Sequence, residues 1–131
     1  MLVVDASVLV VALADDASDG DRARARLSGE DLIAPELADL EVLSVLRRVV
    51  ASGAMTNRCA SLAVDDLASL PMVRSPHQPL LRLCWELRDN FTSYDAAYVA
   101  LAEALECTLL TADDRLRAAP GSTCHIELLE R

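Results

Sequence analysis

Continuous apolar runs alternate along the chain with longer segments in which apolar and polar positions recur at helical spacing. The runs occupy 2–4, 32–34 and 108–110, and segments 72–74 and 125–128 are further strand candidates. A short continuous apolar run is typical of a parallel strand that is buried on both faces. The pattern therefore predicts a sheet built from these runs, with 125–128 as an edge strand.

The segments between the runs predict helices. Thr56 is a good N-cap for the helix that follows it, Ser93 is expected to cap another, and Gly53 ends the long helix before Thr56. Because strands alternate with helices, we expect a single α/β domain over 1–131, a three-layer α/β/α sandwich with a central, mainly parallel sheet. The predicted helices are 6–14, 21–27, 36–51, 57–70, 80–88, 93–105 and a short one from 112.

Four acidic residues are placed to converge at one edge of this sheet. Asp5 and Asp113 each follow a predicted strand, Glu41 lies inside the long helix, and Asp95 lies in the first turn of another helix. Sites in parallel α/β sheets form beyond the carboxyl ends of the strands. Converging carboxylates raise one another's pKa unless a cation is present. The pattern therefore predicts a divalent metal and metal-assisted hydrolysis of a phosphodiester.

Each acid taken alone also has a structural explanation. Asp5 can cap the helix that follows it, and Ser7 can orient the Asp5 carboxylate or cap the helix itself. Glu41 lies beside Arg48 on a largely apolar helix face, where a carboxylate is costly unless it is paired or bound to a metal. A structural ion pair with an arginine is the alternative for Glu41.

The other two acids lie near helix N-termini. Acids in a first helical turn interact favourably with the helix dipole, which is a sufficient explanation for Asp95. Asp113 follows Thr111, and either Thr111 or Asp114 could cap the next helix in its place. Arg115 lies beside Asp113 and could contact phosphate. The chemical prediction therefore depends on the four acids acting together.

Composition changes this picture in two ways. The net charge of −9 is unusual for a nucleic-acid enzyme, and it is partly explained if acids line a metal pocket. All 12 basic residues are arginine, which suits recognition of phosphate. A phosphotransfer receiver needs a lysine in its pocket, and the absence of lysine excludes this class. A P-loop protein needs a lysine and a glycine-rich loop, and this chain has neither. A haloacid-dehalogenase phosphatase would need an aspartate at position 7, where this chain has serine.

The cysteines and the apolar segments indicate in which cellular compartment the protein is expected. The 4 cysteines are widely spaced, so we expect reduced, mostly buried thiols and no zinc site. No apolar run approaches the ~20 residues that span a membrane. No basic stretch precedes the first apolar segment, so no signal peptide is predicted and a cytoplasmic protein is expected.

The acidic blocks resemble those of the PIN-domain ribonucleases, and specifically the VapC toxins of bacterial type II toxin–antitoxin modules. The third block is very close to the family's own motif and is specific by itself. Ser44 stands where many members carry an amide, and Asp114 stands where many carry a basic residue, but all four acids are present. The matching blocks are 4–7, 35–37 with Glu41 and 46–48, 93–102, and 109–113 with Leu116.

The resemblance implies a Mg²⁺-dependent endoribonuclease, with Mn²⁺ as an alternative metal, that cuts structured RNA such as tRNA or rRNA. It implies a homodimer and a cognate VapB-type antitoxin. The dimer could pool arginines 22, 24, 26 and 47 into an RNA groove. A catalytically inactive PIN-like binding domain and an RNA-processing PIN nuclease without an antitoxin are the alternatives. The implied site has Asp5, Glu41, Asp95 and Asp113 as catalytic metal ligands, Ser7 and Thr111 as residues that orient them, and Arg48 and Arg115 as phosphate contacts.

Overall fold

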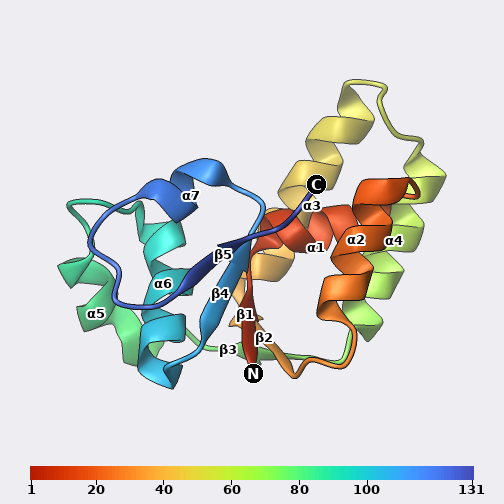
Figure 1. Ribbon diagram of the computed structural model, residues 1–131. Coiled ribbons are helices and arrows are strands. Elements are labelled where there is room, and N and C mark those ends of the chain that lie inside the picture. The colour runs from red at the N-terminus through yellow and green to blue at the C-terminus, as the bar shows by residue number, and fades with distance from the viewer.

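Five parallel strands form the centre of the protein in a computed structural model that describes all residues from 1 to 131 (Figure 1). The strand order is β3-β2-β1-β4-β5, and every pair of neighbouring strands is parallel. The predicted parallel sheet is therefore confirmed, with the last strand at an edge. The strands are β1 (Leu2–Val4), β2 (Leu32–Pro35), β3 (Met72–Ser75), β4 (Thr108–Thr111) and β5 (Ile126–Leu128).

Helices cover both faces of the sheet, as the three-layer prediction requires. Figure 1 shows α1 to α4 gathered on one side of the strands and α5 to α7 on the other. The helices are α1 (Ala6–Ala14), α2 (Ser18–Leu27), α3 (Leu37–Ala51), α4 (Asn57–Ser69), the short 3₁₀ helix η1 (Gln78–Leu80), α5 (Leu81–Glu86), α6 (Ser93–Leu105) and α7 (Asp114–Ala118).

The corner between α1 and α2 is tighter than the sequence predicts, because α2 begins at Ser18 instead of 21. The Arg24 guanidinium donates to the carbonyl oxygens of Ala12 at 2.8 Å and Asp15 at 2.9 Å, and so satisfies groups left free at the end of α1. Gly20 packs directly on the Asp15 carbonyl, where a Cβ atom would lie 1.7 Å from the oxygen. The corner therefore needs a glycine at this position.

Helix boundaries also differ from the predictions at α5, α6 and α7, and α7 begins at Asp114 instead of 112. The predicted helix 80–88 is a 3₁₀ turn followed by the short α5, and Pro79 lies in the first turn of η1. Ser93 is the first residue of α6 and not its cap, so that prediction was wrong. The cap is Thr92, whose Oγ1 accepts from the backbone N–H of Asp95 at 3.1 Å. The predicted cap at Thr56 is confirmed.

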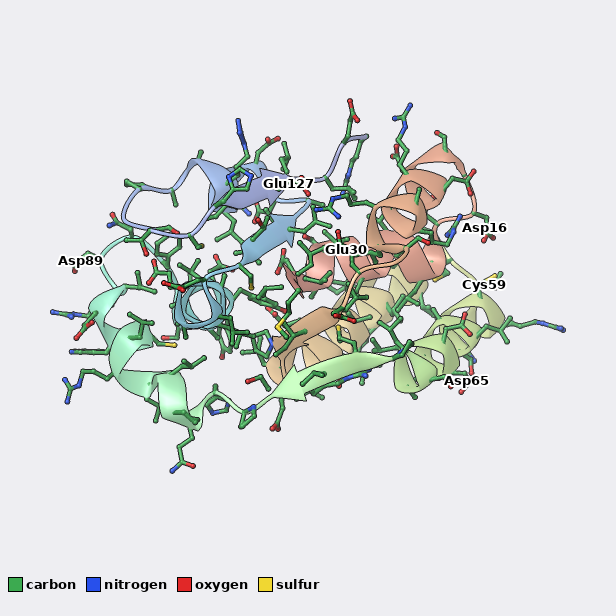
Figure 2. The ribbon with its side chains drawn as sticks, turned by 60° about the horizontal axis from the view of Figure 1, so that its bottom comes forward. Asp16, Glu30, Cys59, Asp65, Asp89 and Glu127 are labelled. Atoms are coloured by element: carbon green, nitrogen blue, oxygen red, sulfur yellow. The ribbon has the colours of Figure 1, made fainter.

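The core is built mainly from aliphatic residues of the sheet and of the helices on both of its faces. All of β1 is buried, and every residue of α6 from 96 to 102 is buried where this helix packs across β1, β2 and β4. The cysteines are free, but none is fully buried, and Cys59 is exposed on α4 at the periphery of the molecule (Figure 2). The expectation of mostly buried thiols was therefore wrong. None of the helices has the length and apolar character to span a bilayer.

Truncation of a central strand residue should reveal how far stability depends on this core. We expect Leu110→Ala to lower the free energy of unfolding by ~2–5 kcal/mol, because Leu110 is fully buried in β4 and the cavity cannot fill. Urea denaturation followed by circular dichroism measures the change. The matched control Val73→Thr changes a side chain that is 59% exposed and should change stability by less than ~0.5 kcal/mol. Equal losses in the two variants would contradict this assignment of the core.

Candidate active site

The sheet reverses its direction of growth between β1 and β4. Strands β2 and β3 lie on one side of β1, and β4 and β5 lie on the other. The carboxyl ends of adjacent strands on either side of such a switch point form a crevice in which α/β proteins bind ligands. Asp5 follows β1 directly, and Asp113 lies two residues beyond the end of β4. The two acids therefore flank the crevice.

The structure brings all four predicted acids to this crevice. Asp5, Glu41, Asp95 and Asp113 line one groove of about 520 Å³, which lies between the ends of the strands, α3 and the start of α6. Arg48 lines the same groove, is exposed and forms no ion pair within the chain. Ser44 lines it as well.

Asp5 is held by two hydroxyl groups. It is only 8% exposed, and both Ser7 Oγ and Thr111 Oγ1 donate to its Oδ2, the latter at 2.9 Å. Thr111 Oγ1 also accepts from the backbone N–H of Asp113 at 3.0 Å. Asp5 is the N-cap residue of α1 by position, but its side chain forms no capping hydrogen bond, so capping does not account for this carboxylate. Ser7 and Thr111 lie where the resemblance implied that they would orient Asp5.

Glu41 is held by a residue that the sequence analysis did not single out. The Tyr98 hydroxyl donates to Glu41 Oε1 at 2.6 Å and accepts from the backbone N–H of Ala6 at 3.3 Å. Glu41 has no arginine partner, so the structural ion pair is wrong. Tyr98 is fully buried, and burial raises its pKa, so the hydroxyl remains a donor. Its spacing of three residues from Asp95, on the same helical face, was the available signal.

The other two acids occupy helix N-termini in different ways. Asp95 lies in the first turn of α6, beneath the Thr92 cap. Asp113 is itself the cap of α7, and its Oδ1 accepts from the backbone N–H of Arg115 at 2.9 Å, so the proposed capping by Thr111 or Asp114 is wrong. The Arg115 guanidinium is highly exposed and lies 3.7 Å from Asp113 Oδ1.

The electrostatics of the groove favour a bound cation. Burial raises the pKa of Asp5, against the hydrogen bonds from Ser7 and Thr111. Burial also raises the pKa of Glu41 and that of Asp95, and the charge of Asp5 raises both further. Three carboxylates are therefore harder to ionise here than in water, and a nearby positive ion would relieve all three.

The donor set suits a hydrated ion of the Mg²⁺ type. No group of three or more His, Cys, Asp or Glu side chains is preformed as a complete ligand cage. Mg²⁺ does not need such a cage, because it keeps several of its waters and binds proteins through one or two carboxylates. The groove supplies only oxygen ligands among its titratable residues, which excludes a structural zinc site of the thiolate–imidazole type.

Two of the arginines expected to form an RNA groove are paired elsewhere. Arg24 contacts Asp21 at 2.7 Å, and Arg26 bridges Glu30 at 2.8 Å and Glu127 at 2.7 Å. Figure 2 labels Glu30 and Glu127, the two carboxylates that Arg26 joins. Neither these two arginines nor Arg22 and Arg47 line the acidic groove.

Similarity to known proteins shows the family of this chain. The sequence matches the family described as PIN domain over residues 2–122. The chain belongs to the PIN-domain family. It is 46% identical to Ribonuclease VapC1 of Mycobacterium tuberculosis over 97% of this chain and 96% of that protein, and 39% identical to Ribonuclease VapC9 of the same species over the whole of both. Its place within the PIN-domain family is thus among the VapC proteins.

Solved PIN structures share its fold. PAE2754 from Pyrobaculum aerophilum superposes with a TM-score of 0.66 at 25% identity, over 95% of this chain and 81% of that one. The structure of M. tuberculosis VapC20, described as a sarcin–ricin loop cleaving toxin, superposes with a TM-score of 0.69 at 16% identity, over 90% of this chain and 94% of that one. At this level of identity the second similarity shows the fold alone.

Loss of the Tyr98 hydroxyl should leave the Glu41 carboxylate without the hydrogen bond that orients it. We expect Tyr98→Phe to weaken Mg²⁺ binding by roughly 10–100-fold, as loss of a residue that orients a metal ligand does. It should also cost ~1–3 kcal/mol of stability, because the Ala6 N–H loses its partner. Isothermal titration with MgCl₂ and thermal unfolding measure the two effects. Tyr94→Phe makes the same chemical change at an exposed position of α6 and should alter neither quantity. Wild-type metal affinity in Tyr98→Phe would contradict the role of this hydroxyl.

The raised pKa of Asp5 predicts an unusual pH dependence of stability in EDTA. The folded protein holds the Asp5 proton more tightly than the unfolded chain, whose aspartates titrate near pKa ~3.9. Ionisation of Asp5 therefore destabilises the fold above its raised pKa, and this loss is recovered as the pH falls towards ~4. The stability of Asp5→Asn relative to wild type should be highest near pH 7 and should decrease as the pH falls towards ~4. Urea denaturation of both proteins across the window measures this, and a difference independent of pH would contradict it.

Proposed function

We propose that this PIN-domain protein is a Mg²⁺-dependent endoribonuclease toxin of a VapBC-type module that cleaves structured cellular RNA in the cytoplasm. One observation carries the proposal. Four carboxylates from four separate segments of the chain line a single groove at the switch point of the sheet, in a chain whose curated relatives are named ribonucleases.

The residues that would hold the metal are Asp5, Glu41, Asp95 and Asp113. When bound, Mg²⁺ supplies Lewis-acid polarisation of the phosphoryl group and lowers the pKa of water. The chain contributes the orientation of the ligands. Ser7 and Thr111 fix the Asp5 carboxylate, and the hydroxyl of Tyr98 fixes that of Glu41.

Two arginines at the groove can bind the phosphodiester backbone of RNA. Arg48 lines the groove and forms no ion pair within the chain. Its guanidinium can therefore bind a phosphodiester oxygen. Arg115 lies beside Asp113 and is almost fully exposed. These two cations are the phosphate contacts that we assign. The RNA site would be an unpaired loop, because bases in an A-form helix are poorly accessible to side chains.

The protein partners are assigned to α3 and α4. Leu40 and Leu43 on α3 and Leu62 on α4 are exposed, with 67% of Leu40 open to solvent. A groove of about 470 Å³ runs between these helices and is lined by Leu43 and Val64 among others. Exposed apolar side chains beside a groove of this kind are typical of protein interaction sites. We assign it to the antitoxin and to the second copy of a homodimer.

The decisive experiment uses two neighbouring aspartates. Asp113 lines the acidic groove, whereas Asp114 lines a different cavity, beside Arg22 and Arg26. We expect Asp113→Asn to lower the cleavage rate by roughly 100-fold or more, and Asp114→Asn to retain most of the activity. Cleavage of total cellular RNA by the purified proteins with Mg²⁺ or Mn²⁺, and with EDTA as a control, measures this.

Each outcome separates the alternatives. A discrete cut that needs the metal and Asp113 supports the nuclease, and the fragment ends identify the target RNA. Metal binding without any cleavage by folded, antitoxin-free protein would favour the inactive binding domain. Equal loss in the two variants would contradict the assignment of Asp113 as the ligand and Asp114 as a bystander. A small protein encoded by a neighbouring gene can be co-expressed as a candidate antitoxin. If it does not inhibit cleavage, an RNA-processing nuclease is favoured.

A further inference from the structure

A second cavity opens beside the acidic groove. Its volume is about 360 Å³, and it lies between α5 and the start of α6. Leu37 and Tyr94 line both the cavity and the acidic groove. Tyr94 is also the residue directly before Asp95 in the chain. The cavity and the acidic groove therefore adjoin at Leu37 and Tyr94.

The cavity is walled by exposed aromatic rings. Trp85 is 59% exposed and Tyr94 is 66% exposed, which is unusual for side chains of this size. The guanidinium carbon of Arg88 lies 4.4 Å from the centre of the Trp85 ring, and this cation–π contact orients the ring. Exposed aromatic rings and guanidinium planes are the surfaces on which proteins stack unpaired bases.

The charge of the cavity is opposite to that of the groove. No aspartate or glutamate lines it, and Arg88 and His77 are its titratable side chains apart from Cys84 and Tyr94. An RNA strand that leaves the acidic groove would thus enter a pocket without repelling carboxylates, where Arg88 can meet a phosphate. A base-sized flat ring fits a cavity of this volume.

We propose that this cavity is a nucleobase subsite. It would hold one unpaired base next to the scissile phosphodiester, stacked on Trp85 and Tyr94, with Arg88 at the adjoining phosphate. The proposal rests on the proposed ribonuclease function, and it assigns part of the selection of single-stranded RNA to α5 and the first turn of α6. Stacking accepts every base, so the subsite selects for an unpaired nucleotide more than for a sequence.

Trp85 is the only tryptophan of the chain, so its fluorescence reports directly on the cavity. The probe is a single-stranded oligoadenylate decamer, titrated at low ionic strength in EDTA, where no cleavage occurs. We expect saturable quenching of the Trp85 emission. A decamer of the same length with abasic riboses should leave the emission unchanged, because it retains the phosphates and lacks the stacking rings.

Kinetics of two substitutions at the same position provide the second test. Trp85→Leu removes the aromatic face and keeps an apolar side chain, whereas Trp85→Phe keeps a ring. With an RNA that the wild type cleaves, we expect Trp85→Leu to raise KM roughly 5- to 100-fold with little change in kcat, and Trp85→Phe to remain within about threefold of wild type. Circular dichroism and thermal unfolding of both variants confirm that they fold.

Failure of the subsite can be told from failure of the ribonuclease function. If the wild type cleaves RNA and Trp85→Leu does so with an unchanged KM, the subsite is wrong and the nuclease stands. If the wild type cleaves no RNA but the decamer quenches Trp85 and the abasic chain does not, the subsite stands and the nuclease is wrong. If Trp85 emission changes with protein concentration alone and not with the decamer, a second copy of the chain covers the cavity and the subsite is overturned.

Discussion

The burial of one carboxylate, that of Asp5, between the ends of β1 and β4 is the constraint on which the site depends. An ionised carboxylate with so little exposure is costly unless it receives hydrogen bonds and meets a positive charge. Ser7 of α1 and Thr111 at the end of β4 provide the hydrogen bonds. Within the folded chain itself no cation contacts Asp5, so the proposed metal ion would stabilise its ionised form.

The same constraint extends to the helices through Tyr98. Its single hydroxyl joins the α1 backbone at Ala6 to Glu41 of α3, while the ring is buried in α6. Helices on opposite sides of the sheet therefore meet at one hydrogen-bonded point beside Asp5. Two of the four acids lie on regular helices and a third caps one, which holds them more precisely than loops would.

This arrangement shapes how so acidic a protein can act on RNA. Much of its basic charge is not available at the groove, since Arg24 and Arg26 are paired with acids of the chain, and Arg74 is paired with Asp39. At the site itself the cations are Arg48 at the groove, Arg115 beside Asp113 and Arg88 at the neighbouring cavity. Cleavage would then rely on the metal and binding on stacking, both of which act at short range. Such an enzyme would select its substrate at the cut site more than by general attraction to nucleic acid.

The sequence by itself determined the architecture and the four acids. Apolar runs that alternate with helical segments specify a parallel sheet by local patterning, and an acid that follows such a run must lie at the edge where sites form. Only the tertiary structure decided the supporting contacts. Tyr98 reaches Glu41 across 57 residues of sequence and Ala6 across 92, and no local spacing encodes such pairs. The pairing of Arg26 with Glu127, 101 residues away, and the neighbouring positions of Trp85 and Tyr94 depend likewise on how separate elements pack. Periodicity fixes which face of an element is buried, but the partner of each side chain is set by the packing of the whole chain.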